Sequence, residues 1–101
     1  ILNRAGTFEG ALILNQQGFA FRPCGSFVWY WLLSSNKLND LTTRYHIARN
    51  TPIRWGERGE VRAILYGIPT KAPRSGDNSE YAYAFHVEVI SSIDANKACV
   101  R

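Results

Sequence analysis

The N-terminal part of the chain carries runs of apolar residues separated by short polar breaks. The first run extends from Thr7 to Asn15, and after Gln16 to Gly18 the pattern resumes at Phe19 to Phe21. Both runs are rich in β-forming residues, and a polar break of this length is typical of a hairpin. We expect Gly10, inside the first run, to mark a bulge or a sharp bend of a barrel strand.

A third strand is predicted from Phe27 to Leu33, after a turn at Pro23 to Ser26. Its residues are apolar on both faces: Phe27, Trp29, Trp31 and Leu33 share one face, and Val28, Tyr30 and Leu32 share the other. One face is expected to lie in the core and the other to be covered. Aromatic strands usually belong to the core, so we expect Trp29 and Trp31 to fill it and Tyr30 to pack under a helix or a partner.

The period of the pattern lengthens after the third strand. Ser34 to Asn36 are good N-cap residues, and apolar positions then recur at helical spacing, at Leu38, Leu41, Tyr45 and Ala48. This pattern predicts a helix of about three turns that ends before Pro52.

Two further strands are predicted beyond the helix. Residues Glu60 to Ile68 alternate polar with apolar, and Pro69 is expected to end that strand. The loop Thr70 to Ser79 is rich in turn residues. Tyr81 to Ile93 is the clearest strand, with its large apolar residues on one face: Tyr81, Tyr83, Phe85, Val87, Val89 and Ile93.

The order of these elements defines the expected fold. No internal repeat or linker interrupts the 101 residues, so we expect a single domain over residues 1–101. Three strands, a helix and two strands match an all-β fold with one helix: a five-stranded OB-type Greek-key barrel with the order β-β-β-α-β-β.

The two cysteines lie at the ends of predicted strands. Cys24 is in the turn before the third strand and Cys99 follows the last one, so the two could meet at one end of the barrel. A disulfide closing that loop would stabilise the fold by about 4 to 5 kcal/mol on a chain-entropy account. The alternatives are two free thiols or a metal site with His46 and His86. Zinc ligands usually come in close pairs, which these four residues do not form, so we expect no metal and no cofactor.

The charge and the ends of the chain say little about function. Twelve Lys and Arg against eight Asp and Glu give a formal charge of +4, and these cations are scattered from Arg4 to Arg101, which favours an ordinary solvated surface over an anionic partner. The longest apolar run, Phe27 to Leu33, is too short to span a bilayer. The chain begins at Ile1 and contains no Met, so we expect its natural start to have been removed, by processing after export or by trimming.

Several short motifs are typical of one family. They are Gly6 to Phe8 opening the first strand, Phe21 to Gly25 around the first cysteine, the aromatic strand and the helix after it, Gly59 to Gly67, and a last strand ending near Cys99. On these motifs the chain resembles the OB-like C-terminal domain of NlpE-type envelope lipoproteins and related META-like periplasmic domains. The resemblance implies a periplasmic or outer-membrane lipoprotein context. This sequence holds no CxxC and no lipid-bearing cysteine at its start, so copper binding and lipidation do not carry over.

No constellation of catalytic residues is recognisable. His46 falls on the predicted helix, His86 falls in mid-strand and the carboxylates are dispersed, so we expect no enzyme. We expect instead an exported binding module, periplasmic or outer-membrane associated, that binds a protein partner in the cell envelope, for example as an accessory subunit of a larger assembly. The alternative is a single-stranded nucleic-acid-binding OB domain, which stacks bases on aromatic side chains beside Arg or Lys.

The candidate binding surface combines aromatic and basic residues of the third and fourth strands with those of two loops, because loops and barrel faces carry recognition in small β domains. Its members are Tyr30, Arg54, Trp55, Arg62, Tyr66, Lys71 and Arg74. Trp29 and Trp31 would join this set if the ligand were a nucleic acid.

Overall fold

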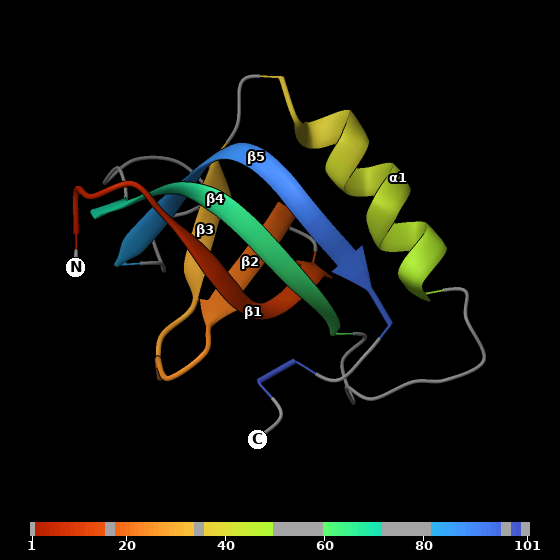
Figure 1. Ribbon diagram of the computed structural model, residues 1–101, viewed down its shortest axis with the longest axis horizontal. Coiled ribbons are helices and arrows are strands. Elements are labelled where there is room, and N and C mark those ends of the chain that lie inside the picture. Colours follow the sequence, from red (N-terminus) through yellow and green to blue (C-terminus); the bar gives the residue numbers. More distant parts are fainter. Residues whose placement is uncertain are drawn as a thin grey trace.

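The computed structural model describes residues 2–15, 18–33, 36–49, 60–71, 82–95 and 98–99. Within these ranges the chain forms five strands and one helix (Figure 1). In chain order they are β1 (Gly6–Asn15), β2 (Gly18–Pro23), β3 (Tyr30–Leu33), α1 (Leu38–Arg49), β4 (Val61–Lys71) and β5 (Tyr83–Asp94).

The strands close into a barrel in the order β1-β2-β3-β5-β4. β1 pairs antiparallel with both β2 and β4, and β4 pairs antiparallel with β5. β3 runs parallel to β5, and this pair closes the barrel after the chain has crossed over through α1. These pairings confirm the five-stranded OB-type Greek-key barrel with the order β-β-β-α-β-β.

Gly10 lies in the part of β1 that pairs with β2 on one side and with β4 on the other. It pairs with Pro23 at the end of the β1–β2 ladder and with Ala63 within the β1–β4 ladder, and neither ladder has a register shift there. A Cβ atom at this position would collide with the carbonyl oxygen of Arg22 and come within 2.8 Å of the Cα atom of Pro23. Gly10 therefore permits a close approach of two backbones, without the bulge that we considered.

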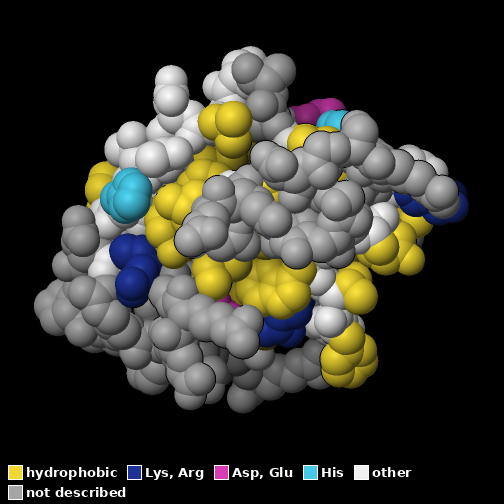
Figure 2. All heavy atoms as spheres, turned by 180° about the vertical axis from the view of Figure 1, so that it is seen from behind, with side chains coloured by type: hydrophobic (Ala, Val, Ile, Leu, Met, Phe, Trp, Pro, Cys, Tyr) yellow, Lys and Arg dark blue, Asp and Glu magenta, His cyan; other side chains and the backbone are white. Residues whose placement is uncertain are grey.

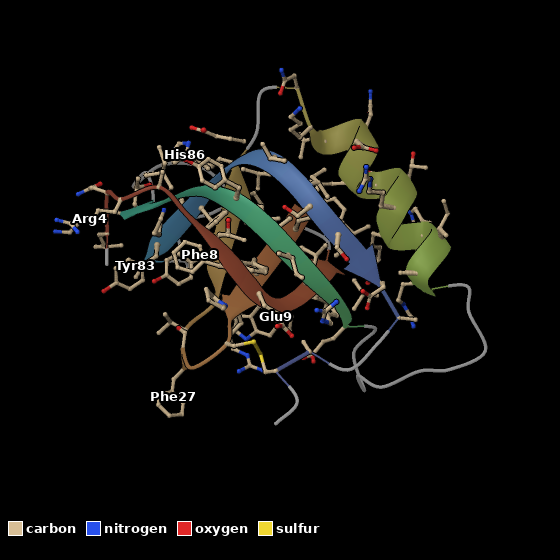
Figure 3. The ribbon with its side chains drawn as sticks, in the orientation of Figure 1. Arg4, Phe8, Glu9, Phe27, Tyr83 and His86 are labelled. Carbon is tan, nitrogen blue, oxygen red and sulfur yellow. A yellow bond between two sulfur atoms is a disulfide. The ribbon has the colours of Figure 1, made fainter. Side chains whose placement is uncertain are left out.

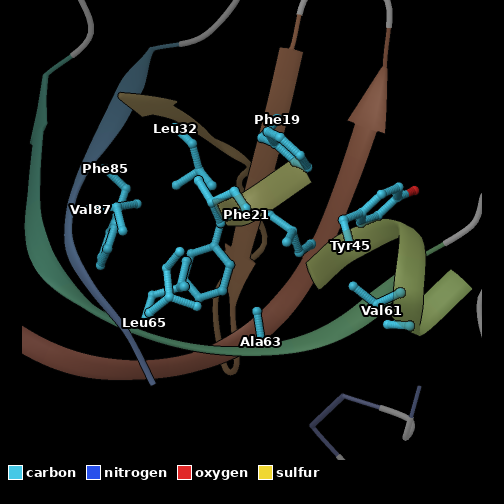
Figure 4. Packing of buried hydrophobic residues seen from close by; sticks show 13 residues of the cluster. Phe19, Phe21, Leu32, Tyr45, Val61, Ala63, Leu65, Phe85 and Val87 are labelled. Carbon is cyan, nitrogen blue, oxygen red and sulfur yellow. The ribbon is translucent and has the colours of Figure 1, made fainter. Parts of the chain in front are cut away.

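Side chains from all five strands and from the helix meet inside the barrel (Figure 4). The buried cluster comprises Leu12, Phe19, Phe21, Leu32, Leu41, Tyr45, Ala48, Val61, Ala63, Leu65, Phe85, Val87 and Ile90. The helical residues of this cluster are those that the spacing predicts to face inward, except that Leu38 is exposed. Tyr45 packs edge-on against Phe19, with ring centroids 5.6 Å apart, and so joins α1 to the barrel core.

β3 begins at Tyr30, three residues later than predicted. The turn after β2 extends further, because the Ser26 N–H donates to the Pro23 carbonyl oxygen at 3.0 Å and the Val28 N–H donates to Ser26 Oγ at 3.1 Å. These local bonds keep the backbone of Phe27 and Val28 out of the barrel ladder. The prediction that a strand begins at Phe27 is therefore wrong.

β4 runs through Pro69 to Lys71, although Pro69 was expected to end it. In a strand, the N–H and C=O of one residue point to the same side. The Pro69 carbonyl accepts the Asn3 N–H at 2.6 Å, away from β5, so the missing N–H of Pro69 removes no bond to β5. Beyond Gly67 no residue of β1 pairs with β4, which makes this an edge position where proline is tolerated.

β5 contains two register shifts against β4. The partners change from Val87 to Val89 and from Ile90 to Ser92, so Glu88 and Ser91 are each an extra residue in the strand. Each bulge reverses the alternation of faces. Val89 was expected in the core but is half-exposed on the outer face, and Ile90 is buried in its place.

Gly67 pairs with Val87 beside the first bulge of β5. A Cβ atom there would collide with the His86 carbonyl oxygen and lie 2.7 Å from the ring of Phe85. We expect Gly67→Ala to lower the free energy of unfolding by about 2 to 3 kcal/mol in a urea titration, because backbone on the partner strand cannot give way cheaply.

Gly6→Ala is the matched control for this substitution. At Gly6 the nearest atom to a new Cβ belongs to the side chain of Phe8, at 3.3 Å, and a ring edge can move. We expect a change of less than about 0.5 kcal/mol. Equal losses for the two variants would contradict the register of β4 against β5.

Candidate functional site

Tyr30 lies on the inner side of β3. It pairs with Phe21, packs against the buried cluster and contacts the Tyr83 ring, with centroids 5.5 Å apart. Tyr30 was expected on an outer binding face, and this placement is wrong. Leu32 of β3 faces the core, and Tyr30, two residues earlier on the same strand, therefore faces inward as well.

Arg62 is held by two carboxylates on the outer surface of the barrel. Its Nε donates to Glu9 Oε2 at 3.1 Å and its Nη1 donates to Asp94 Oδ2 at 2.7 Å. The hydrogen bond to Glu9 raises the pKa of Arg62 above its ordinary value, burial opposes this rise, and the hydrogen bond to Asp94 adds to it. A ligand at Arg62 would have to compete with both carboxylates.

We expect Arg62→Gln to destabilise the domain by roughly 1 to 2 kcal/mol, because two charge-assisted bonds to partly buried carboxylates are lost. Arg44→Gln is the control. Its ion pair with Asp40 joins residues four apart on α1 and is more exposed, so its loss should cost no more than about 0.5 kcal/mol. Thermal unfolding of the two variants should differ clearly, and equal midpoints would mean that the Arg62 cluster adds no stability.

The other predicted binding residues do not gather around Tyr30 and Arg62. Tyr66 lies on the outer face of β4, between Thr7 and Val89, and Lys71 is exposed at the end of the same strand. β4 has β1 and β5 as neighbours, so these two residues are separated from β3 in the barrel. Arg54, Trp55 and Arg74 lie outside the described residues.

Trp31 covers the outside of the barrel, and the prediction that Trp29 and Trp31 fill the core is wrong. Trp31 pairs with Ala20 of β2 and with Ala84 of β5, and both alanines are buried although neither belongs to the core cluster. The Trp31 ring also lies within 2.9 Å of where a Cβ of Gly18 would be. Small residues on both neighbouring strands thus make room for an indole on the outer face.

The loop between β2 and β3 carries the most exposed apolar side chain among the described residues. Phe27 is 99% exposed and Val28 is 42% exposed. Figure 3 shows Phe27 at the end of this loop, pointing away from the barrel. Beside it, the guanidinium carbon of Arg22 lies 5.4 Å from the centre of the Trp29 ring, and Arg22 Nη1 donates to the Ser26 carbonyl at 3.4 Å.

A disulfide joins this loop to the C-terminal tail. Cys24 and Cys99 are bonded, with their Cα atoms 5.3 Å apart, which confirms the predicted pairing. Glu9 holds both ends: its carbonyl accepts the Cys24 N–H at 2.8 Å, and its Oε2 accepts the Cys99 N–H at 3.3 Å. The base of the loop is therefore fixed to β1 and to the tail at the same point.

We name the loop and its surroundings the β2–β3 surface, and define it by Arg22, Phe27, Val28, Trp29 and Trp31. On the face of the molecule seen in Figure 2, apolar side chains gather over the middle, with Lys and Arg side chains beside them. The β2–β3 surface itself combines aromatic, aliphatic and arginine side chains, and aromatic and arginine side chains are enriched at the centre of protein interfaces.

Sequence reasoning did not assign Arg22 or Phe27 to a binding surface. The signal for Phe27 was present in the turn residues Gly25 and Ser26, which delay the start of β3. Arg22 offered no such signal, because its stacking on Trp29 depends on the shape of the loop.

The two histidines are exposed, His46 on α1 and His86 on the outer face of β5. Their environments give no sign of a shared site. In the described ranges, no three His, Cys, Asp or Glu side chains group as metal ligands would. No described helix is long and apolar enough to cross a membrane.

Comparison of the chain with protein-family models, with curated proteins and with solved structures found no match.

Proposed function

We propose that this chain is a non-enzymatic binding module of the cell envelope whose β2–β3 surface docks a protein partner. The observation that carries the proposal is the exposed pair Phe27 and Val28 on a loop whose base is tied down by the Cys24–Cys99 disulfide. Phe27 and the neighbouring Trp29 and Arg22 are of the residue types that are enriched at protein interfaces. The resemblance to NlpE-type and META-like envelope domains agrees with this assignment.

The disulfide supports an exported location. Disulfides persist in oxidising compartments such as the periplasm and are rare in the cytosol. The disulfide therefore supports the part of the proposal that puts the module in the periplasm or at the outer membrane.

Two measurements on native cells test the proposal. Free thiols are blocked with iodoacetamide before lysis, and the mass of the recovered protein shows whether Cys24 and Cys99 were oxidised. An amine-reactive cross-linker applied to the same cells should join the protein to one envelope protein, and the two purified proteins should then form a complex of fixed stoichiometry. Free thiols together with a cytoplasmic location, or no complex after purification, would remove the proposal.

A single-stranded nucleic acid is the second candidate ligand. The observation that favours it is that Trp29 and Trp31 lie outside the core, with Arg22 against the Trp29 ring, since OB domains bind strands on the face of β2 and β3. Against it, Arg62 and Arg44 are each paired with a carboxylate, so neither is freely offered to phosphates.

Titration with a short oligothymidylate distinguishes the two candidates. Nucleic-acid binding predicts quenching of tryptophan fluorescence that weakens steeply as salt is raised. Protein docking predicts no quenching at physiological salt.

A further inference from the structure

Phe27 is positioned by its loop. The turn bond from Ser26 to Pro23, the bond between Val28 and Ser26 Oγ and the contact of Arg22 with the Ser26 carbonyl all lie within one residue or two of it along the chain. The disulfide fixes the loop at Cys24. The backbone on both sides of Phe27 is held in this way, so a partner that binds the side chain need not order the loop.

We infer that Phe27 is an anchor side chain that inserts into an apolar pocket on a protein partner, with Arg22 facing carboxylates at the rim of that pocket. The inference rests on the proposed function and names the chemistry of its partner. An aromatic side chain that is buried at the centre of an interface and surrounded by polar groups typically dominates the affinity. Arg22 places a positive charge beside the anchor, where it complements an acidic rim.

A lipid surface fits these residues less well. A single myristoyl chain binds a bilayer only marginally, with an association constant on the order of 10⁴ M⁻¹. Phe27 and the exposed part of Val28 present fewer apolar carbons than that chain, so their insertion alone would not hold the domain on a membrane. A protein pocket adds contacts around the anchor and does not depend on the anchor alone.

A second copy of this chain is also a poorer occupant. Two copies bring together equal charges of +4, and the cation beside the anchor, Arg22, would face another positively charged molecule.

Site-specific photo-cross-linking in native cells tests the inference. The photoreactive residue p-benzoylphenylalanine replaces Phe27 in one variant and Ile47 in the other. Ile47 is the matched control because it is an exposed apolar residue, 66% exposed, on α1 and away from the loop. We expect an adduct with one envelope protein from position 27 and none from position 47.

The captured protein is then identified, purified and titrated with the full chain. Phe27→Ala should weaken the affinity by ten- to a hundredfold, and Ile47→Ala by less than twofold. The pair Cys24→Ser and Cys99→Ser should also weaken the affinity, because Phe27 loses its positioning. Circular dichroism checks that all variants retain the barrel.

Four results would overturn the inference: equal adducts or none at the two positions, an adduct only with lipid, an adduct only with a second copy of the chain, or unchanged affinity for Phe27→Ala. Binding of the wild type to vesicles of phosphatidylethanolamine and phosphatidylglycerol, abolished by Phe27→Ala, would assign the loop to lipid. If the purified complex forms but tolerates Phe27→Ala, the inference fails while the proposed function stands. If no complex forms, both fail.

Discussion

Phe85→Ala should lower the free energy of unfolding by about 3 to 5 kcal/mol. Phe85 is fully buried, and its ring contacts Phe8 edge-on, with centroids 5.5 Å apart, and Phe21, with centroids 5.4 Å apart. It also pairs with Leu32 across the parallel strands that close the barrel. Removing the ring leaves a cavity that three strands cannot easily fill. In thermal unfolding, the midpoint should fall by more than about 10 °C.

Phe27→Ala is the control for this result, because it removes the same ring from a residue that is 99% exposed. It should change the free energy of unfolding by less than about 0.5 kcal/mol. A large loss at Phe27, or a small one at Phe85, would contradict the placement of these two rings. Unchanged stability of Phe27→Ala would also show that its fold is intact. Any loss of partner binding in this variant would then come from the surface.

The identity and order of the elements could be predicted because they depend on local periodicity. Leu41, Tyr45 and Ala48 recur at helical spacing, and the same three residues face the core. Val61, Ala63 and Leu65 recur at every second position and are likewise buried. Such patterns require only that one face of each element is covered, whichever element covers it.

The placement of individual side chains on strands was harder to predict, because it depends on how neighbouring strands pair. Val89 continues the alternation of Phe85 and Val87, but the extra residue Glu88 reverses its side, and nothing in the sequence marks that bulge. From local sequence alone, Trp31 is predicted to lie in the core. Its outer position depends on its cross-strand neighbours Ala20 and Ala84, which only the pairing of the strands shows.

The candidate site was limited by the same difficulty. Arg62 resembles any exposed arginine on an alternating strand, because its partners Glu9 and Asp94 lie 53 and 32 residues away in the sequence. The disulfide could be predicted because only two cysteines are present and both lie at strand ends. The residues that bind ligands in a small barrel are set by loops and by long-range pairing, which local patterns do not encode.

Removing the disulfide through Cys24→Ser and Cys99→Ser should destabilise the domain by about 4 to 5 kcal/mol. The bond spans 75 residues, so it strongly restricts the unfolded chain, and most of its effect arises there. Domains of this size have total stabilities of about 5 to 15 kcal/mol, so the variant should be folded but marginal. Urea unfolding of the variant and of the oxidised wild type measures the difference.

Two further observations separate the effect on the unfolded chain from that on the native loop. Adding tris(2-carboxyethyl)phosphine should lower the stability of the wild type to that of the variant and leave the variant unchanged. In hydrogen exchange, the Cys99 N–H, which donates to Glu9, and the Ser26 N–H, which donates to Pro23, should lose protection in the reduced protein, while the amides of β4 and β5 exchange only on global unfolding. A stability loss below about 1 kcal/mol would contradict the chain-entropy account. Unchanged protection of the Cys99 and Ser26 amides in the reduced protein would mean that Glu9 and the turn bonds hold the loop and tail without the covalent bond. In that case the orientation of Phe27 would not depend on the oxidation state of Cys24 and Cys99.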